Sequence, residues 1–159
     1  MSDANPIRLR PLTRSDLPVL VANQLDPDAN RMVAHSRDNT DRTQVEAHWL
    51  SILDRDDVIL RGVEWNGQLA GYLIAFEHGG LPEVGYWLGR DYWGRGLASH
   101  GLRLFLCELP QRPLHAWAAK DNLASLRVLE KCGFVRYGES QHFSPARGAD
   151  IIGYRLRLD

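Results

Sequence analysis

Apolar and polar positions recur along the chain with two different periods, and these periods predict the order of its elements. Alternation at every second residue, as in Ile7-Arg8-Leu9-Arg10, is typical of a strand with one buried face. Apolar residues three and four positions apart, as in Val45, Trp49 and Ile52, are typical of a helix with one buried stripe. We therefore expect strands over residues 7–10, 58–65, 69–77, 84–88, 114–118, 134–137 and 151–158. We expect a first helix that is capped by Thr13 or Ser15, runs to about Leu25 and is broken by Asp26-Pro27-Asp28. Further helices are expected over 44–53, from 97 to a point before Pro110, and over 123–131.

Turn and cap residues separate these segments. Asn66-Gly67 is a strong hairpin signal, and His78-Gly79-Gly80 predicts a second turn, so the three middle strands should form an antiparallel meander. Thr43, followed three residues later by Glu46, is typical of a capping box at the start of the second helix. Two polar segments, 29–41 and 138–150, lack either period and are expected to be irregular.

The predicted order is β-α-α-β-β-β-α-β-α-β-β, which indicates an α/β fold with a mixed sheet and helices on both faces. The strand at 114–118 follows a strand–helix unit, so it should pair in parallel with the strand at 84–88 through a right-handed crossover. With 159 residues, 44% of them hydrophobic, the chain is expected to form one domain over 1–159.

Composition excludes several classes of protein. The net charge is −1, which lacks the basic excess of a general nucleic-acid binder. No apolar run has the length of a membrane span or the form of a signal peptide, so we expect a soluble cytoplasmic protein without membrane contact. The two cysteines, Cys107 and Cys132, are expected to be buried thiols, and with six scattered histidines they give no metal-ligand spacing.

The most informative segment runs from Val84 to Leu106. It predicts a strand, a short loop and then Gly94-Arg95-Gly96-Leu97-Ala98 at the start of an amphipathic helix. A helix N-terminus carries unbonded N–H groups and the positive end of the helix dipole, and glycines let a ligand approach the backbone closely. The segment therefore predicts an anion site for a phosphate or pyrophosphate. It lacks the third glycine of a Rossmann fingerprint, and no P-loop motif occurs in the chain.

Two motifs in this order resemble the GNAT superfamily of acetyl-CoA-dependent N-acetyltransferases. The family's Arg/Gln-x-x-Gly-x-Gly/Ala corresponds to Asp91-Tyr92-Trp93-Gly94-Arg95-Gly96, and its Asn-initiated helix with a following Gly-Phe corresponds to residues 122–134. Gly85-Tyr86-Trp87-Leu88 and Asn122-x-x-Ser125 are similar to the RimJ/RimL-like branch. Asp91 replaces the usual Arg or Gln, which shifts the expected phosphate contacts onto backbone amides.

The resemblance implies a GNAT-like acyl-CoA N-acyltransferase fold and acetyl-CoA as the co-substrate, with no metal. In the family the strand before the loop separates from its parallel neighbour, and the pantetheine arm lies in the gap. We expect the arm to bond backbone groups of Tyr86 to Leu88, the pyrophosphate to bond amides from Trp93 to Ser99 with Arg95 as a charge partner, and Asn122 to bond the pantetheine. The implied cofactor-binding residues are Tyr86, Trp87, Leu88, Trp93, Gly94, Arg95, Gly96, Leu97, Ala98, Ser99, Asn122 and Ser125.

The implied reaction is direct attack of a neutral amine on the thioester in a ternary complex. The family's tyrosine acid is replaced here by Leu129, which cannot donate a proton, so Ser125 is the expected donor to the leaving thiolate. Glu83 is the expected general base, with Glu77-His78 and His115 as alternatives.

The acceptor is an amine, either on a small molecule or at a protein N-terminus. His35 to Asn39 and Gln141 to Ala149 should flank its entrance. Two other functions stay open: a non-catalytic acyl-CoA-binding sensor on the same fold, and a nucleotide-binding module that uses the same loop. The oligomeric state, a homodimer included, also stays open.

Overall fold

A seven-stranded mixed sheet organises the part of the chain that the structure, a computed structural model, describes: residues 7–32, 41–145 and 147–159. The strand order is β1-β2-β3-β4-β5-β7-β6. The strands are β1 Ile7–Arg10, β2 Ile59–Trp65, β3 Gln68–His78, β4 Leu81–Leu88, β5 Leu114–Ala119, β6 Val135–Ser144 and β7 Ala149–Leu158. The helical elements are η1 Arg14–Asp16, α1 Leu17–Leu25, α2 Pro27–Met32, α3 Arg42–Leu53, η2 Arg90–Tyr92, α4 Leu97–Glu108 and α5 Leu123–Lys131. The mixed α/β fold predicted from the sequence is confirmed.

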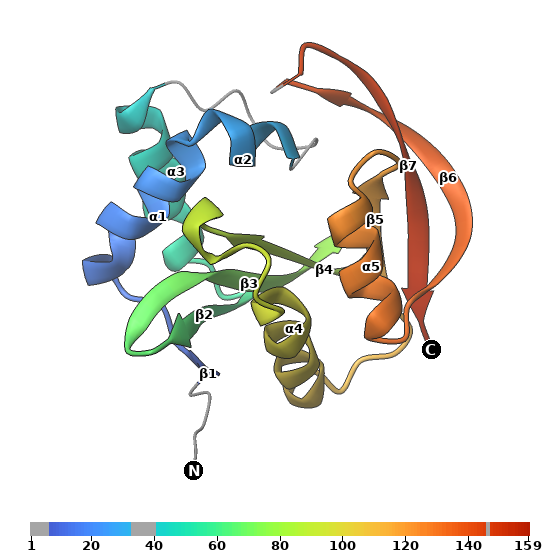
Figure 1. Cartoon of the computed structure of the whole chain (residues 1–159), viewed down its shortest axis with the longest axis horizontal. Helices are drawn as coiled ribbons and strands as arrows, with labels where there is room; N and C mark the ends of the chain where they lie inside the picture. The colour runs from blue at the N-terminus through green and yellow to red at the C-terminus, as the bar shows by residue number, and fades with distance from the viewer. Residues whose placement is uncertain (1–6, 33–40, 146) are drawn as a thin grey trace.

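The helices cover the sheet in two layers (Figure 1). The larger core includes Leu102 and Phe105 of α4, Leu126 of α5, and sheet residues such as Leu73 and Leu114. A smaller core, which includes Leu20, Val21 and Trp49, joins α1 and α3 to the sheet. Burial of each large apolar side chain contributes about 1.5–3 kcal/mol, so both layers are fixed firmly to the sheet.

The sheet opens between its two parallel strands. β4 pairs with β3 from His78↔Leu81 to Gly71↔Leu88, but its ladder with β5 consists of the single pair Glu83↔His115. Beyond this pair the two strands separate, and β5 instead pairs along its length with β7. The separation implied by the family resemblance is therefore present, on the Tyr86–Leu88 side of the pair.

The turn predictions hold where local chemistry decides the backbone. Asn66 and Gly67 both have positive φ, 51° and 78°, as a tight two-residue hairpin requires. The expectation that residues 29–41 are irregular is wrong at their start, because residues 29–32 belong to α2. Pro27 ends α1 but is itself the first residue of α2, a position at which proline is favoured. The second helix begins at Arg42 with Asp41 as its cap, whose carboxylate accepts the Thr43 amide at 2.9 Å, so Thr43 is not the cap.

The expectation of a polar loop over 138–150 is wrong. β6 and β7 form one long antiparallel hairpin with turn residues at 145, 147 and 148, and Figure 1 shows it curving along the outer side of α5. Most β6 side chains are exposed, so this edge strand has no alternating apolar face by which the sequence could reveal it. Asp121, in the loop before α5, forms an ion pair with Arg147 at 2.6 Å, which ties the tip of the hairpin to that loop.

Cys107 corrects another expectation. It is exposed, and Cys132 is half-buried. The buried stripe of α4 contains Leu102, Phe105 and Leu106, so the next residue turns toward solvent. No helix within the described ranges is both long and apolar enough to span a membrane.

Candidate active site

The opening between β4 and β5 leads into a cavity of about 640 Å³. Its walls come from β4, from the loop and first turn of α4, from β5 and from α5, with β3, β6 and β7 closing one side. Every residue predicted to bind the cofactor lines this cavity, with the exception of Arg95, and so does the predicted base Glu83. The structure thus brings together side chains that lie up to 42 residues apart, from Glu83 to Ser125.

The anion site lies at the start of α4. Gly94 and Gly96 have φ of 76° and 75°, a left-handed conformation that any other residue adopts at a cost. Within the described part of the chain, no backbone acceptor bonds the amides of residues 94–99, whereas the His100 amide bonds the Gly96 carbonyl at 3.2 Å. These amides are available to an anion. The prediction that the Trp93 amide bonds the pyrophosphate is corrected, because this amide already bonds the Arg90 carbonyl at 3.2 Å.

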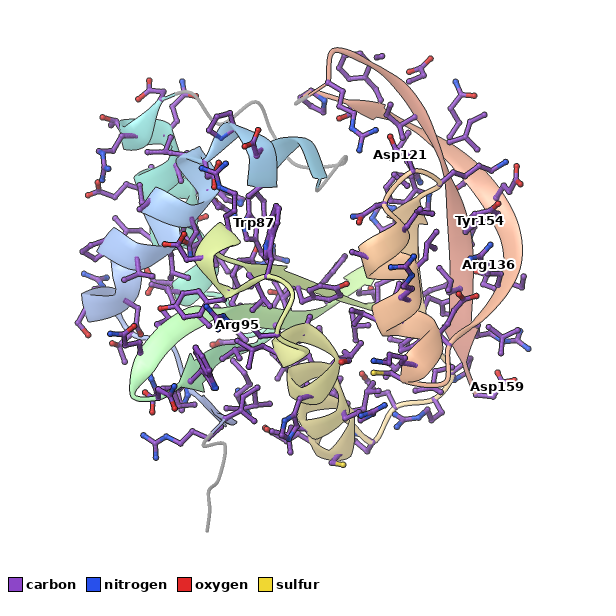
Figure 2. The ribbon with its side chains drawn as sticks, viewed as in Figure 1. Trp87, Arg95, Asp121, Arg136, Tyr154 and Asp159 are labelled. Carbon is purple, nitrogen blue, oxygen red and sulfur yellow. The ribbon has the colours of Figure 1, made fainter. Side chains whose placement is uncertain are left out.

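Arg95 lies away from the cavity. Its guanidinium carbon is 5.1 Å from the centroid of the Trp65 ring, a cation–π contact. Figure 2 shows Arg95 on the side of the α4 N-terminus that faces away from α5. Asp91, in η2, is exposed and does not line the cavity. An anion at this helix start would therefore meet backbone N–H groups first.

Ser125 has two partners in the cavity wall. Its amide donates to Oδ1 of Asn122, at 3.2 Å, so Asn122 caps α5 as a helix-starting asparagine should. Its hydroxyl oxygen accepts from the phenol of Tyr86 at 2.9 Å, across the gap between α5 and β4. Burial raises the pKa of Tyr86 to about 12, so this phenol keeps its proton at neutral pH. The tyrosine partner of Ser125 has no signal in local sequence spacing.

Among the described residues that line the cavity, Glu83 is the one with a carboxylate side chain. It is half-buried on β4, and loss of hydration raises its pKa, although the nearby charges of His78 and Arg155 act in the opposite direction. A carboxylate with a raised pKa is a better proton acceptor than an exposed one. Of the alternatives, His78 lines the cavity and Glu77 does not.

The side chain of His115 contacts Tyr137 of β6. Its Nδ1 lies 3.0 Å from the Tyr137 hydroxyl, and that hydroxyl in turn accepts from Nε of Arg155 at 2.9 Å. Because the Tyr137 oxygen accepts from Arg155, its own proton is directed to the histidine. Burial, with the charges of Arg155 and Arg157, lowers the pKa of His115. His115 does not line the cavity, so its geometry supports a structural role.

One side of the cavity was predicted only in part: the sequence predicted Trp87 and the segment that contains Phe143, but not Phe76 or Arg155. Aromatic side chains of Phe76, Trp87, Trp117 and Phe143 line it, and Arg155 of β7 adds a cation. Trp117 meets the His142 ring edge-on at 5.0 Å. Figure 2 shows Trp87 near the middle of the molecule. Its indole N–H is buried without a hydrogen-bond partner in the described residues.

The predicted acceptor entrance is described only in part. His35 to Asn39 lie outside the described residues. The described residues of the segment from Gln141 to Ala149 form the end of β6, part of the hairpin turn and the first residue of β7, and His142 and Phe143 line the cavity. Within the described ranges, no three histidine, cysteine or acidic side chains are grouped so as to hold a metal ion.

Comparison with known proteins agrees with this geometry. The family described as "Acetyltransferase (GNAT) domain" matches residues 7–135, which include the cavity walls from β3 to α5. The chain belongs to this family. A curated relative, the uncharacterized N-acetyltransferase p20 of Bacillus licheniformis, is 27% identical over 92 residues, 55% of this chain. The chain spans about half, 52%, of the length of that relative.

Solved structures show the same GNAT fold. Spermidine N-acetyltransferase from Vibrio cholerae, in complex with CoA and spermine, superposes with a TM-score of 0.82 at 17% identity, covering 96% of this chain and 94% of that one. Mycobacterium smegmatis RimJ, in complex with CoA-disulfide, superposes with a TM-score of 0.79 at 21% identity, covering 96% and 81%. Membership in the family supports acetyl transfer as the general chemistry.

Proposed function

We propose that this GNAT protein transfers the acetyl group of acetyl-CoA to a primary amine by direct attack in a ternary complex. The observation that carries the proposal is the opening of the sheet between β4 and β5, which leads to the α4 N-terminus with its unbonded amides. The α4 end of this cavity suits a pyrophosphate, and the separated β4 leaves backbone groups with which an extended arm can pair. The two CoA-bound neighbours share the fold.

Acetyl-CoA would be held mainly by backbone groups. The amides of Gly94 to Ser99 would receive the pyrophosphate, in place of the arginine or glutamine that Asp91 replaces. The amides of the pantetheine arm would pair with Tyr86 to Leu88, as an added strand pairs with a sheet edge. Asn122, across the gap on the α5 side, would bond the arm, although its side-chain oxygen also caps the helix.

Two side chains, Glu83 and Ser125, carry out the proton transfers. Glu83 takes a proton from the incoming ammonium, so the neutral nitrogen can attack the thioester carbonyl carbon. The C–N bond forms, the C–S bond then breaks, and the thiolate takes the hydroxyl proton of Ser125. Ser125 then recovers a proton from the attacking nitrogen, which loses its second proton as it becomes the amide nitrogen. The net products are the N-acetyl amine, CoA with a free thiol, and one proton released to water.

The hydrogen bond from Tyr86 supports the proposal that Ser125 replaces the missing tyrosine acid. Because the serine oxygen accepts from Tyr86, its own proton points elsewhere, and the donated bond stabilises negative charge on that oxygen. Leu129, at the position of the family's tyrosine, is buried and apolar. The phenol of Tyr86, on β4, thus acts through Ser125, whereas the family motif would place a tyrosine on α5 itself.

We also propose the branch of the family to which the chain belongs and the class of its acceptor. The phrases Gly85-Tyr86-Trp87-Leu88 and Asn122-x-x-Ser125, together with the likeness to RimJ, favour the RimJ/RimL-like branch. The acceptor is a small-molecule amine or a protein N-terminus. The amines that neighbours bind, such as spermine, support the first class. We also propose that residues 1–159 act as one domain.

The test is release of free CoA thiol from acetyl-CoA with a panel of amines and N-terminal peptides, with the acetylated product measured by mass. We expect thiol and product in equal amounts for at least one acceptor. Ser125→Ala should slow turnover, whereas Ser51→Ala, an exposed serine on α3, should not. Stabilisation by CoA without turnover on any acceptor would favour a sensor. No stabilisation by CoA against thermal unfolding would refute the proposal.

A further inference from the structure

The acceptor side of the cavity contains an arginine that the transfer chemistry does not use. Arg155 lines the cavity, opposite Trp117 in the β5–β7 ladder. Its Nε donates to the Tyr137 hydroxyl at 2.9 Å. Its two terminal nitrogens have no carboxylate partner within the described ranges, whereas neighbouring Arg157 pairs with Asp159 at 2.8 Å. A half-buried guanidinium with donors to spare is suited to bind an anion.

Arg155 and Glu83 lie on the same face of the sheet. Glu83 pairs with His115 of β5, Trp117 lies two residues further along that strand, and Arg155 is the β7 partner of Trp117. Alternation along a strand puts residues two apart on one face, so Glu83, Trp117 and Arg155 all face the same space. The cavity therefore presents a carboxylate and a guanidinium on two sides of one aromatic wall.

The cations of α5 differ from Arg155 in position. Arg127 and Lys131 also line the cavity, but they lie on the helix that begins at Asn122, on the face of the sheet that carries the larger core. Acetyl-CoA phosphates would engage that side. Arg155, on the opposite face, would meet the acceptor molecule. Its charge repels a second ammonium group, which disfavours a polyamine in this space.

We propose that the acceptor is an amine that also carries a carboxylate, with an apolar side chain, and that Arg155 binds this carboxylate while Glu83 faces the amine. The inference deepens the proposed function and rests on it. The apolar part would contact the aromatic wall formed by Phe76, Trp117 and Phe143. A free amino acid has these three parts. A protein N-terminus does not, because its α-carbonyl group is an uncharged amide.

Matched acceptor pairs test this assignment. Each pair is an amino acid and the same skeleton without its carboxylate: L-leucine and 3-methylbutylamine, L-phenylalanine and 2-phenylethylamine, L-methionine and 3-(methylthio)propylamine. L-leucinamide represents a peptide N-terminus. We compare kcat/KM for each compound between the wild-type protein and Arg155→Gln, so that the intrinsic basicity of each amine cancels.

We expect Arg155→Gln to lower kcat/KM for each amino acid by about 10- to 100-fold more than for its decarboxylated partner or for leucinamide. The effect of the Arg155 charge on Glu83 is common to all acceptors and cancels in this ratio. Arg155→Lys should restore part of the loss, since it keeps the charge but not the planar fork. Arg157→Gln is the matched control, an arginine on the same strand outside the cavity, and should change neither class.

Equal losses for both classes of acceptor, or equal effects of Arg155→Gln and Arg157→Gln, would overturn the inference while acetyl transfer itself stands. If no amine is acetylated, the proposed function fails separately. In that case the inference is tested by binding of L-phenylalanine to the CoA complex, measured from the quenching of tryptophan fluorescence. Binding that Arg155→Gln weakens at least tenfold supports the carboxylate site, and absence of binding refutes it.

Discussion

Replacement of Gly153 by alanine should distort the wall of the cavity. Gly153 is buried on β7, next to β5, and its backbone needs no positive φ. A Cβ there would lie 2.2 Å from Cε2 and 2.3 Å from Cζ2 of Trp117, and 2.6 Å from the Ala118 carbonyl oxygen. The first of these is 1.2 Å short of the 3.4 Å at which ordinary contact begins. The glycine therefore lets the indole of Trp117 pack directly against the β7 backbone.

The indole of Trp117 cannot move without losing contacts. Its Nε1 donates to the Ser140 carbonyl at 3.4 Å, and its ring meets His142 edge-on. Overpacking of this kind costs about 1–3 kcal/mol, and loss of the hydrogen bond about 1 kcal/mol more. We therefore expect Gly153→Ala to lower the free energy of unfolding by about 2–4 kcal/mol. For a chain of this length, that corresponds to a drop in Tm of roughly 5–15 °C.

Thermal and urea unfolding, followed by circular dichroism, measure the effect. Gly138→Ala is the matched control: this glycine lies on the neighbouring strand β6, without positive φ and with nothing within 4 Å of an added Cβ. It should change stability by no more than about 0.5 kcal/mol. Gly153→Ala should also raise the KM for the acceptor, because the displaced ring lines the cavity. If the two variants unfold alike, the close packing of Trp117 against Gly153 is refuted.

Three further predictions concern charge and proton transfer. Because burial raises the pKa of Glu83, the folded state loses stability as pH rises from the ordinary glutamate value through the raised one; Glu83→Gln should therefore raise Tm at pH 8, and equal Tm values for variant and wild type at that pH would contradict this. The Arg10 guanidinium, 2.9 Å from both carboxylate oxygens of Asp16, holds the pKa of that carboxyl below its usual value. Asp16→Asn should cost about 1–3 kcal/mol near pH 7, and urea unfolding should show this loss disappear as pH falls through the lowered pKa. In steady-state kinetics Ser125→Ala should lower kcat by about 100-fold or more, and Tyr86→Phe by about 3- to 10-fold. The double variant should be no slower than Ser125→Ala, since Tyr86 acts through Ser125; additive losses would show independent roles.

Local chemistry explains which parts of the fold could be predicted. Asn66-Gly67 determines its own turn, and Asn122 caps α5 through its own side chain, so both could be inferred from a few adjacent residues. The glycines at 94 and 96 likewise fix the backbone at the α4 N-terminus. β6 could not be inferred in this way, because an exposed edge strand depends on its partner strand and not on its own apolar pattern.

The parts of the site that depend on distant contacts were not predictable. Tyr86 and Ser125 are 39 residues apart, and only the packing of α5 over β4 brings the phenol to the serine. Arg155 alternates with apolar residues on β7, but the sequence does not show which face of that strand borders the cavity. The register of β7 on β5 decides this, and the proposed acceptor chemistry depends on it.

Hydrogen exchange in the presence and absence of acetyl-CoA tests the central claim most directly, that the opening between β4 and β5 holds the thioester with its pyrophosphate at the start of α4. The account predicts slower exchange of the amides in Tyr86–Leu88 and in 94–99 when acetyl-CoA binds. It predicts no change in β1 or β2, which lie outside the cavity. Binding of acetyl-CoA that leaves exchange at 86–88 and 94–99 unchanged would contradict it.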